Sequence, residues 1–181
     1  VPAPIKPLTS DCSGCAQTAE HAYLAQRLNL PMSQPEQKLL LENHPHLRLV
    51  FGDGSVAQVG ELARELGATK ALLVTDSGIV VAGHSARVND LLESAGIGVT
   101  VFDRSKENPT TTCVDDCMSM ARDAGIDFII GLGGGSSMDT AKGCNFILTN
   151  GGEMKDYWGI GKASQPILPS IMIPTTAGTG S

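Results

Sequence analysis

The stretch that decides the fold is DFIIGLGGGSSMDTAK, residues 127–142. Its first part, Phe128 to Ile130, is a continuous apolar run of the kind found in strands that are covered on both faces. Three glycines, Gly133 to Gly135, come soon after, and a helical pattern begins at Ser136. A buried strand that runs through glycines into a helix predicts a turn whose backbone a ligand can approach closely.

The same alternation of strand and helix patterns extends through the chain from residue 47. Apolar runs predict strands at 47–51, 71–74, 97–102, 128–130 and 171–173. Apolar residues at helical spacing predict helices at 56–66, 88–95, 114–121 and 138–148, with Gly67, Gly96, Gly125 and Gly151 after their ends. Ser55 and Gln58 have the spacing of a capping box at the first of these helices. We therefore predict an α/β fold, a doubly wound and mostly parallel sheet with helices on both faces.

The chain divides near residue 46. Residues 1–46 are rich in proline, and we expect a partly irregular N-terminal extension there, with one short helix at 16–30 and an interaction role as one alternative. Residues 47–181 form the predicted α/β domain. The chain begins with Val1 and stops at Ser181 inside a glycine- and threonine-rich run, so we expect a piece of a longer protein, truncated at the C-terminal end of this domain.

Composition excludes several classes of protein. The apolar fraction of 41% and the charged fraction of 18% are those of an ordinary globular chain. A formal charge of −6 without basic runs argues against binding to nucleic acid or to an acidic membrane surface. No apolar stretch has the length of a transmembrane helix or a secretory signal, and five cysteines is an odd number. We expect free thiols in a reducing cytoplasm.

The cysteines also allow a metal-site hypothesis. Cys12 and Cys15 have the spacing of a zinc knuckle, with three histidines of the extension as further ligands, namely His21, His44 and His46. The alternative is a pair of thiols in a mobile arm. In the α/β domain, we expect Cys117 and Cys144 to act as small core residues and His84 to lie at the surface or at a helix start.

The glycine turn predicts a phosphate site. Residues without Cβ at Gly133, Gly134 and Gly135 let the backbone wrap a diphosphate, and the first turn of the helix that opens near Ser136 directs free N–H groups toward it. The alternative is a tight turn in which Ser136 is a plain N-cap. This is not the ordinary dinucleotide fingerprint, because its third small residue is a serine and the best ribose-binding acid lies upstream of the glycines.

That acid is Asp76, which directly follows the run Leu72-Leu73-Val74-Thr75. A carboxylate there would accept hydrogen bonds from a ribose and would repel a 2′-phosphate, which favours NAD over NADP. The alternative is a helix N-cap or turn aspartate. A last apolar run at 171–173 enters the hydroxyl-rich loop 174–181, which would suit a sugar or phosphate, or else is a flexible linker. Residues 108–110 predict a turn and a helix start.

Four motifs taken together carry a family resemblance. Their order and spacing resemble those of the iron-containing alcohol dehydrogenase family over residues 47–181; they are GGGSSMDTAK (133–142), PTTAGTGS (174–181), Val74-Thr75-Asp76 and Asn108-Pro109-Thr110. The resemblance implies an N-terminal domain of the dehydroquinate synthase-like type that binds NAD or, less readily, NADP. It also implies a C-terminal helical domain, absent from this chain, in which an Asp and three His would hold Fe²⁺ or another divalent metal.

The resemblance also assigns roles to residues. Gly133, Gly134, Gly135 and Ser136 would take the pyrophosphate and Asp76 the adenosine ribose, with Thr175, Thr176 and Thr179 along the adenosine and phosphates. Asn108 would lie near the pyrophosphate or the nicotinamide. Asp139 would lie close to the cofactor and, with Lys142, would fix the glycine loop through hydrogen bonds and an ion pair.

The activity that the resemblance implies is hydride transfer between a small alcohol or aldehyde and nicotinamide. We expect the 181 residues alone to bind nucleotide without turnover, and a homo-oligomer is compatible with the sequence. One alternative is an enzyme similar to glycerol dehydrogenase or dehydroquinate synthase, which share this fold. Another is a stand-alone dinucleotide-binding module without catalysis.

Overall fold

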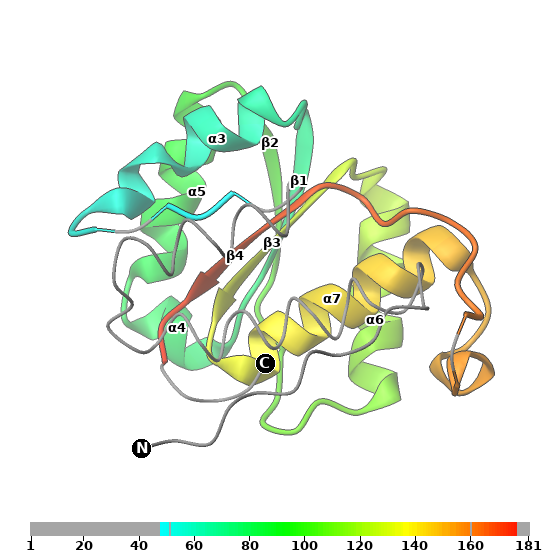
Figure 1. Cartoon of the computed structure of the whole chain (residues 1–181). Helices are drawn as coiled ribbons and strands as arrows, with labels where there is room; N and C mark the ends of the chain where they lie inside the picture. The colour runs from blue at the N-terminus through cyan, green and yellow to red at the C-terminus, as the bar shows by residue number, and fades with distance from the viewer. Residues whose placement is uncertain (1–47, 51, 160, 177–181) are drawn as a thin grey trace, which may run out of the picture.

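The computed structural model describes residues 48–50, 52–159 and 161–176 of the chain. They form one parallel sheet with helices on both sides (Figure 1). In chain order the elements are η1 (Ser55–Gln58), α3 (Val59–Glu65), β1 (Lys70–Val74), α4 (Ser77–Val81), α5 (His84–Ser94), β2 (Gly98–Phe102), α6 (Thr111–Ala124), β3 (Phe128–Gly133), α7 (Gly135–Asn150), η2 (Met154–Tyr157) and β4 (Ser170–Pro174).

The four strands of the described sheet lie in the order β2-β1-β3-β4, and all neighbours are parallel. In the centre, Leu72 of β1 lies opposite Thr100 of β2 on one side and Ile129 of β3 on the other. The chain therefore leaves β1 in one direction to form β2 and then crosses back to form β3. The carboxyl ends of β1 and β3 mark the point where the winding reverses, which is where open α/β sheets bind ligands.

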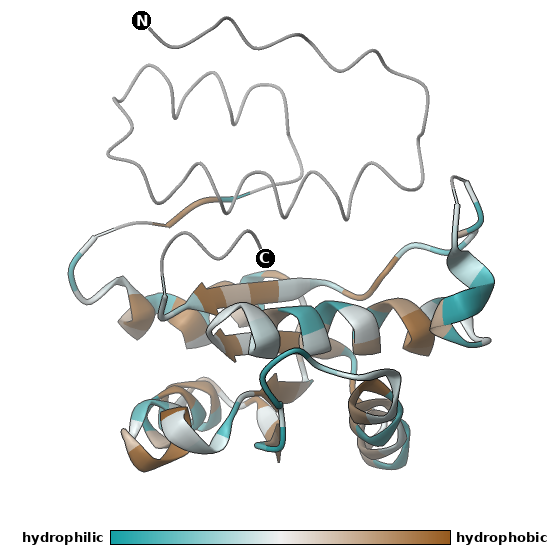
Figure 2. Ribbon diagram, turned by 90° about the horizontal axis from the view of Figure 1, so that it is seen from below, coloured by the Kyte–Doolittle hydropathy of each residue, from teal (hydrophilic) through white to brown (hydrophobic). Residues whose placement is uncertain are grey.

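Each face of the sheet is covered by its own helices, so the predicted α/β fold is confirmed. Ala71 and Leu73 of β1 face α3 and α5, where they share a core with Leu92. Leu72 and Val74 face α6 and α7 on the other side (Figure 1). All of β3 is buried, as its uninterrupted apolar run predicts. In Figure 2 the strands are mostly brown, whereas the helices mix teal with brown, which is the pattern of a sheet between two helical layers.

The predicted helix ends are confirmed by backbone conformation. The glycines that follow α3, α5, α6 and α7 all have positive φ; they are Gly67, Gly96, Gly125 and Gly151. The predicted helix start at 108–110 is also confirmed, because the side chain of Thr110 caps α6 and accepts a hydrogen bond from the Cys113 amide at 3.4 Å. His84 is exposed at the first residue of α5.

Three local predictions were wrong. Residues 48–50, the described part of the predicted strand 47–51, are not in a strand. The predicted capping box is absent, because the N-cap residue of η1 is Gly54 and no side chain caps it. The helix after the glycine turn begins at Gly135 rather than Ser136, and its N-cap residue is Gly134. Helix α4 was not predicted, since it is short and has no buried residue.

Several predictions lie outside the described residues. They concern the extension 1–46, its helix at 16–30, the Cys12–Cys15 pair, the histidines His21, His44 and His46, and Thr179.

Polar side chains fix the strands at the end opposite the glycine turn. The carboxylate of Asp127, just before β3, accepts hydrogen bonds from the amides of Thr69 and Lys70 at 3.0 and 2.9 Å and from the Thr69 hydroxyl. Asn145 of α7 is only 1% exposed, and its amide group pairs with both N–H and C=O of Leu168, each at 2.9 Å. The first contact joins β1 to β3, and the second sets where β4 begins.

Candidate functional site

The glycine turn joins the carboxyl end of β3 to the amino end of α7, as the sequence predicts. Gly133 ends the strand with φ +143°, and Gly134 precedes the first helical residue, Gly135. The first amides of a helix have no partner within the helix, and the helix dipole makes this end positive. The turn is therefore built to receive an anion.

The space behind the turn has no room for a side chain at Gly133. A Cβ added there would lie 2.7 Å from the Ser137 hydroxyl oxygen and 3.0 Å from Oδ2 of Asp76. Both neighbours are polar groups that belong to other parts of the site. The position therefore needs glycine for two reasons, its backbone conformation and the close approach of these two groups.

Asp76 stands at the carboxyl end of β1, directly beside the turn. Its Oδ1 accepts a hydrogen bond from the Ile79 amide at 3.1 Å, and its Oδ2 accepts one from the Ser137 hydroxyl at 2.9 Å. The first contact makes Asp76 the N-cap of α4, so the N-cap role given as the alternative in the sequence analysis is present. The second contact brings the same carboxylate to the glycine turn, which a cap alone does not require.

The segment after β4 lies against the turn from the other side. The Thr175 amide donates a hydrogen bond to the Gly133 carbonyl oxygen at 2.9 Å. A Cβ added at Gly134 would lie 3.3 Å from the Thr176 hydroxyl oxygen. The structure thus brings the predicted residues Thr175 and Thr176 to the predicted turn, and both are exposed there.

A cavity of about 450 Å³ opens at this edge of the sheet. It is lined by residues from the ends of β1, β2 and β3, namely Asp76, Ser77, Ser105, Lys106, Glu107, Gly134, Ser136 and Ser137. Sequence reasoning named Asp76, Gly134 and Ser136 and missed the rest. The only signal that the sequence offered for 105–107 was their place shortly after a predicted strand, 97–102.

Ser105 is the least expected residue of this wall. It is 8% exposed, its amide donates to the Thr75 carbonyl oxygen at 3.2 Å, and its hydroxyl has no hydrogen-bond partner. Buried hydroxyls normally have partners, because an unpaired one is costly. A hydroxyl without a partner at the wall of a cavity is suited to a polar ligand.

Asn108 does not line the cavity in this structure. It is exposed and is the only described non-glycine residue with positive φ, at +52°. Asparagine tolerates this left-handed conformation better than most residues do, so the turn itself accounts for its presence.

Asp139 and Lys142 lie on α7, beyond the glycine turn. Lys142 Nζ lies 3.8 Å from Asp139 Oδ1, so the predicted ion pair is present, with the side chains 21% and 49% exposed. Burial lowers the pKa of Lys142, and the Asp139 charge opposes that shift. Neither residue lines the cavity.

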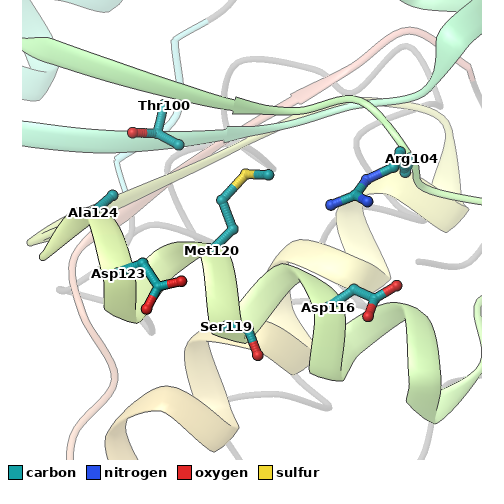
Figure 3. A pocket seen from close by; sticks show the side chains of 7 residues that line it. All are labelled: Thr100, Arg104, Asp116, Ser119, Met120, Asp123 and Ala124. Atoms are coloured by element: carbon teal, nitrogen blue, oxygen red, sulfur yellow. The ribbon is translucent and has the colours of Figure 1, made fainter.

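A second cavity, of about 430 Å³, lies between β2 and α6 (Figure 3). Its lining includes Arg104, Asp116 and Asp123, and Figure 3 shows Met120 pointing from the helix toward the strands. The last turn of α6, which holds Asp123, carries the negative end of a helix dipole. Two carboxylates and that dipole make this cavity a poor site for a phosphate.

The cysteines of the α/β domain are packing residues. Cys113, Cys117 and Cys144 carry free thiols and are buried, the last two completely, as predicted for Cys117 and Cys144. The hydrogen bond with Cys144 and burial raise the pKa of the Cys117 thiol. Within the described ranges, no three side chains of the metal-ligating kinds gather at one place, and no helix there is long and apolar enough to cross a membrane.

Comparisons with known proteins point in one direction. The profile of the family described as "Iron-containing alcohol dehydrogenase" matches residues 45–181. The chain is 38% identical over 132 residues to the NAD-dependent methanol dehydrogenase of Bacillus methanolicus, covering 73% of this chain and 35% of that protein. It is 35% identical over 133 residues to the lactaldehyde reductase of Escherichia coli strain K12, with 72% and 35% covered. The chain thus spans about a third of the length of these curated relatives.

Solved structures agree with the fold. A crystal structure of a 1,3-propanediol oxidoreductase superposes with a TM-score of 0.67 at 37% identity, covering 70% of this chain and 33% of the other. The sulfoacetaldehyde reductase of Bifidobacterium kashiwanohense, solved in complex with NAD⁺, superposes with a TM-score of 0.63 at 35% identity, with 71% and 34% covered. The four-stranded sheet and its helices match the N-terminal domain of such enzymes, and the chain belongs to the iron-containing alcohol dehydrogenase family.

Proposed function

We propose that this chain binds NAD at the carboxyl edge of β1 and β3, and that the protein to which it belongs transfers a hydride between a small alcohol or aldehyde and the nicotinamide. One observation carries the proposal. The glycine turn 133–135 opens α7 directly beside Asp76, whose carboxylate is hydrogen-bonded to the first turn of that helix at 2.9 Å. An anion-binding turn next to a fixed ribose-binding acid is the combination that a dinucleotide needs.

The residues present suit this cofactor. Gly133 to Ser136 would hold the pyrophosphate, Asp76 the adenosine ribose, and Thr175, Thr176 and Thr179 the adenosine side and phosphates. The unpaired Ser105 hydroxyl in the cavity wall would find a partner in a polar ligand. Asn108 would lie near the pyrophosphate or the nicotinamide, and Asp139 would lie close to the cofactor.

The bound nicotinamide would supply the hydride chemistry, and the described residues would supply binding and orientation. They do not fit a resident iron or other divalent ion, because no ligand cluster is present among them. Relatives include an NAD-dependent methanol dehydrogenase and a lactaldehyde reductase, which supports a small alcohol or aldehyde as the substrate class. The cytoplasmic location and the homo-oligomer stay predictions.

Calorimetric titration of NAD and NADP into the 181-residue chain tests the proposal. We expect saturable binding of NAD, weaker binding of NADP, and no alcohol oxidation by the chain alone. Asp76→Ala should lower the affinity for NAD by roughly tenfold, which corresponds to the loss of about one charge-assisted hydrogen bond. Equal NAD affinity in both proteins would show that Asp76 does not bind the ribose. Alcohol oxidation by the 181 residues would contradict the expectation that they bind nucleotide without turnover.

A further inference from the structure

We infer that Ser137 is a positioning residue that holds the Asp76 carboxylate in place and thereby sets the preference of the site for NAD over NADP. The inference rests on the proposed cofactor site. It concerns a residue that the phosphate-binding motif does not require, since Gly133 to Ser136 already supply the turn. Ser137 is fully buried in the first turn of α7 and lines the cavity.

Two donors from different elements fix the carboxylate. The Ser137 hydroxyl of α7 donates to Oδ2 of Asp76 at 2.9 Å, and the Ile79 amide of α4 donates to Oδ1 at 3.1 Å. One donor would leave the carboxylate free to turn about its bond to the side chain. Two donors, one on each oxygen, define the plane and the direction of the group.

The contact also sets the carboxylate at a fixed place relative to the turn. A Cβ at Gly133 would lie 2.7 Å from the Ser137 oxygen and 3.0 Å from Oδ2 of Asp76, so both groups pack closely behind this glycine. Gly133 is the residue at which β3 ends and the phosphate-binding turn begins. The acid that would meet the ribose is therefore tied by Ser137 to the turn that would meet the pyrophosphate.

The hydrogen bond between Ser137 and Asp76 affects which cofactor the site prefers. A 2′-phosphate carries nearly two negative charges at neutral pH and is repelled by a carboxylate that cannot move away. Lys106 and Glu107 both line the same cavity, where the ammonium of Lys106 would attract that phosphate and the carboxylate of Glu107 would repel it. Without the Ser137 hydroxyl, the Asp76 carboxylate could turn aside, and the balance between Asp76 and Lys106 would shift toward NADP.

The test is a double-mutant cycle on the 181-residue chain, with dissociation constants for NAD and NADP measured by calorimetry. The variants are Ser137→Ala, Asp76→Ala, the double variant, and Thr149→Val as a matched control. The Thr149 hydroxyl donates to carbonyl oxygens of α7 and accepts from the Asn150 side chain of the same helix, far along it from the turn. Thermal unfolding checks whether each variant is folded, and Ser137→Cys, which keeps a weak donor, replaces Ser137→Ala if the latter does not fold.

We expect Ser137→Ala to lower the ratio of the NADP to the NAD dissociation constant by about fivefold or more, and Ser137→Cys to fall between it and the unaltered chain. In the Asp76→Ala background, removal of the Ser137 hydroxyl should change neither constant by more than about twofold. Thr149→Val should leave both constants unchanged.

The other outcomes contradict either the positioning role of Ser137 or the proposed NAD site. If Asp76→Ala changes the ratio and Ser137→Ala does not, the positioning role is wrong and the ribose assignment stands. An effect of Ser137→Ala that persists without Asp76 means that Ser137 acts on the ligand or the fold directly, and the inference fails. If Asp76→Ala changes nothing, or the unaltered chain binds no NAD, the proposed site and the inference fall together.

Discussion

At the scale of single residues, the site depends on close approach rather than on many polar groups. Gly133 shows this most clearly, because its φ of +143° and its two near neighbours both exclude a side chain. Ser105 and Ser137 contribute buried hydroxyls. The Ser105 hydroxyl has no hydrogen-bond partner, and the Ser137 hydroxyl donates to Asp76. Such roles arise where three strand ends meet and are not visible in any local pattern.

Gly133→Ala should lower the free energy of unfolding by about 1–3 kcal/mol, because the added Cβ meets polar atoms and the backbone is strained. NAD binding should be lost as the turn shifts. Gly98→Ala is the matched control, since a Cβ there has only ordinary contacts at 3.7 and 3.9 Å and should change stability by less than about 0.5 kcal/mol. Denaturant unfolding measures both variants, and equal losses would show that crowding behind the turn does not matter.

Two variants of Asn108 distinguish a role in the backbone turn from a role in binding the ligand. Asn108→Gly keeps the left-handed conformation, so stability should hold, whereas Asn108→Ala should cost about 1 kcal/mol. If the side chain contacts the cofactor as proposed, both variants should lose NAD affinity to a similar degree. Full affinity in Asn108→Gly would limit this residue to shaping the turn.

At the scale of elements, the sheet is held at its far end so that the strand ends meet correctly at the site. Asn145 does this for β4 through its two hydrogen bonds with Leu168. Asn145→Leu should lower the free energy of unfolding by about 1–3 kcal/mol, because the N–H and C=O of Leu168 lose their partners. Asn150→Ala, which removes contacts with the exposed residues Ser164 and Gln165, should cost less. The reverse order, measured by urea unfolding, would show that Asn145 does not set the start of β4.

Asp127 ties β1 to β3, and its effect depends on pH. Its slight burial raises the pKa, but the hydrogen bonds from Thr69 and Lys70 outweigh this and lower the pKa below the ordinary 3.8. The folded protein therefore binds this proton less readily than the unfolded chain, so the stabilisation is present above pH 3.8 and is lost as the pH falls through the folded pKa. Unfolding measured between about pH 2 and 5 should show this loss, and Asp127→Asn should flatten it. If the free energy of unfolding of the variant depends on pH as strongly as that of the unaltered chain, the loss comes from other groups.

At the scale of the whole molecule, the sequence predicts the fold because each strand of the sheet is a short apolar run between helical patterns. The run 71–74 and the buried β3 are clear examples, and the glycines after four helices mark their ends. The segment 47–51 has the same apolar character, yet residues 48–50 are not in a strand, because a strand also needs a pairing partner that no local pattern specifies.

The candidate site was predictable to a similar depth. Asp76, Gly134 and Ser136 stand out locally, as an acid after a strand and small residues before a helix, and all three line the cavity. Ser105, Lys106 and Ser137 join them only because β2 lies next to β1 and α7 begins beside Asp76. Strand order decides these neighbours, and the local patterns of the sequence do not specify it.

Binding of NAD at the carboxyl edge of β1 and β3 can be mapped by following the amide signals of the ¹⁵N-labelled chain during a titration with NAD. We expect saturable shifts at 76–77, 105–107 and 133–137, and none in the cavity of Figure 3 at 116–124. Shifts confined to 116–124, or no shifts at NAD concentrations that saturate relatives of this family, would contradict it.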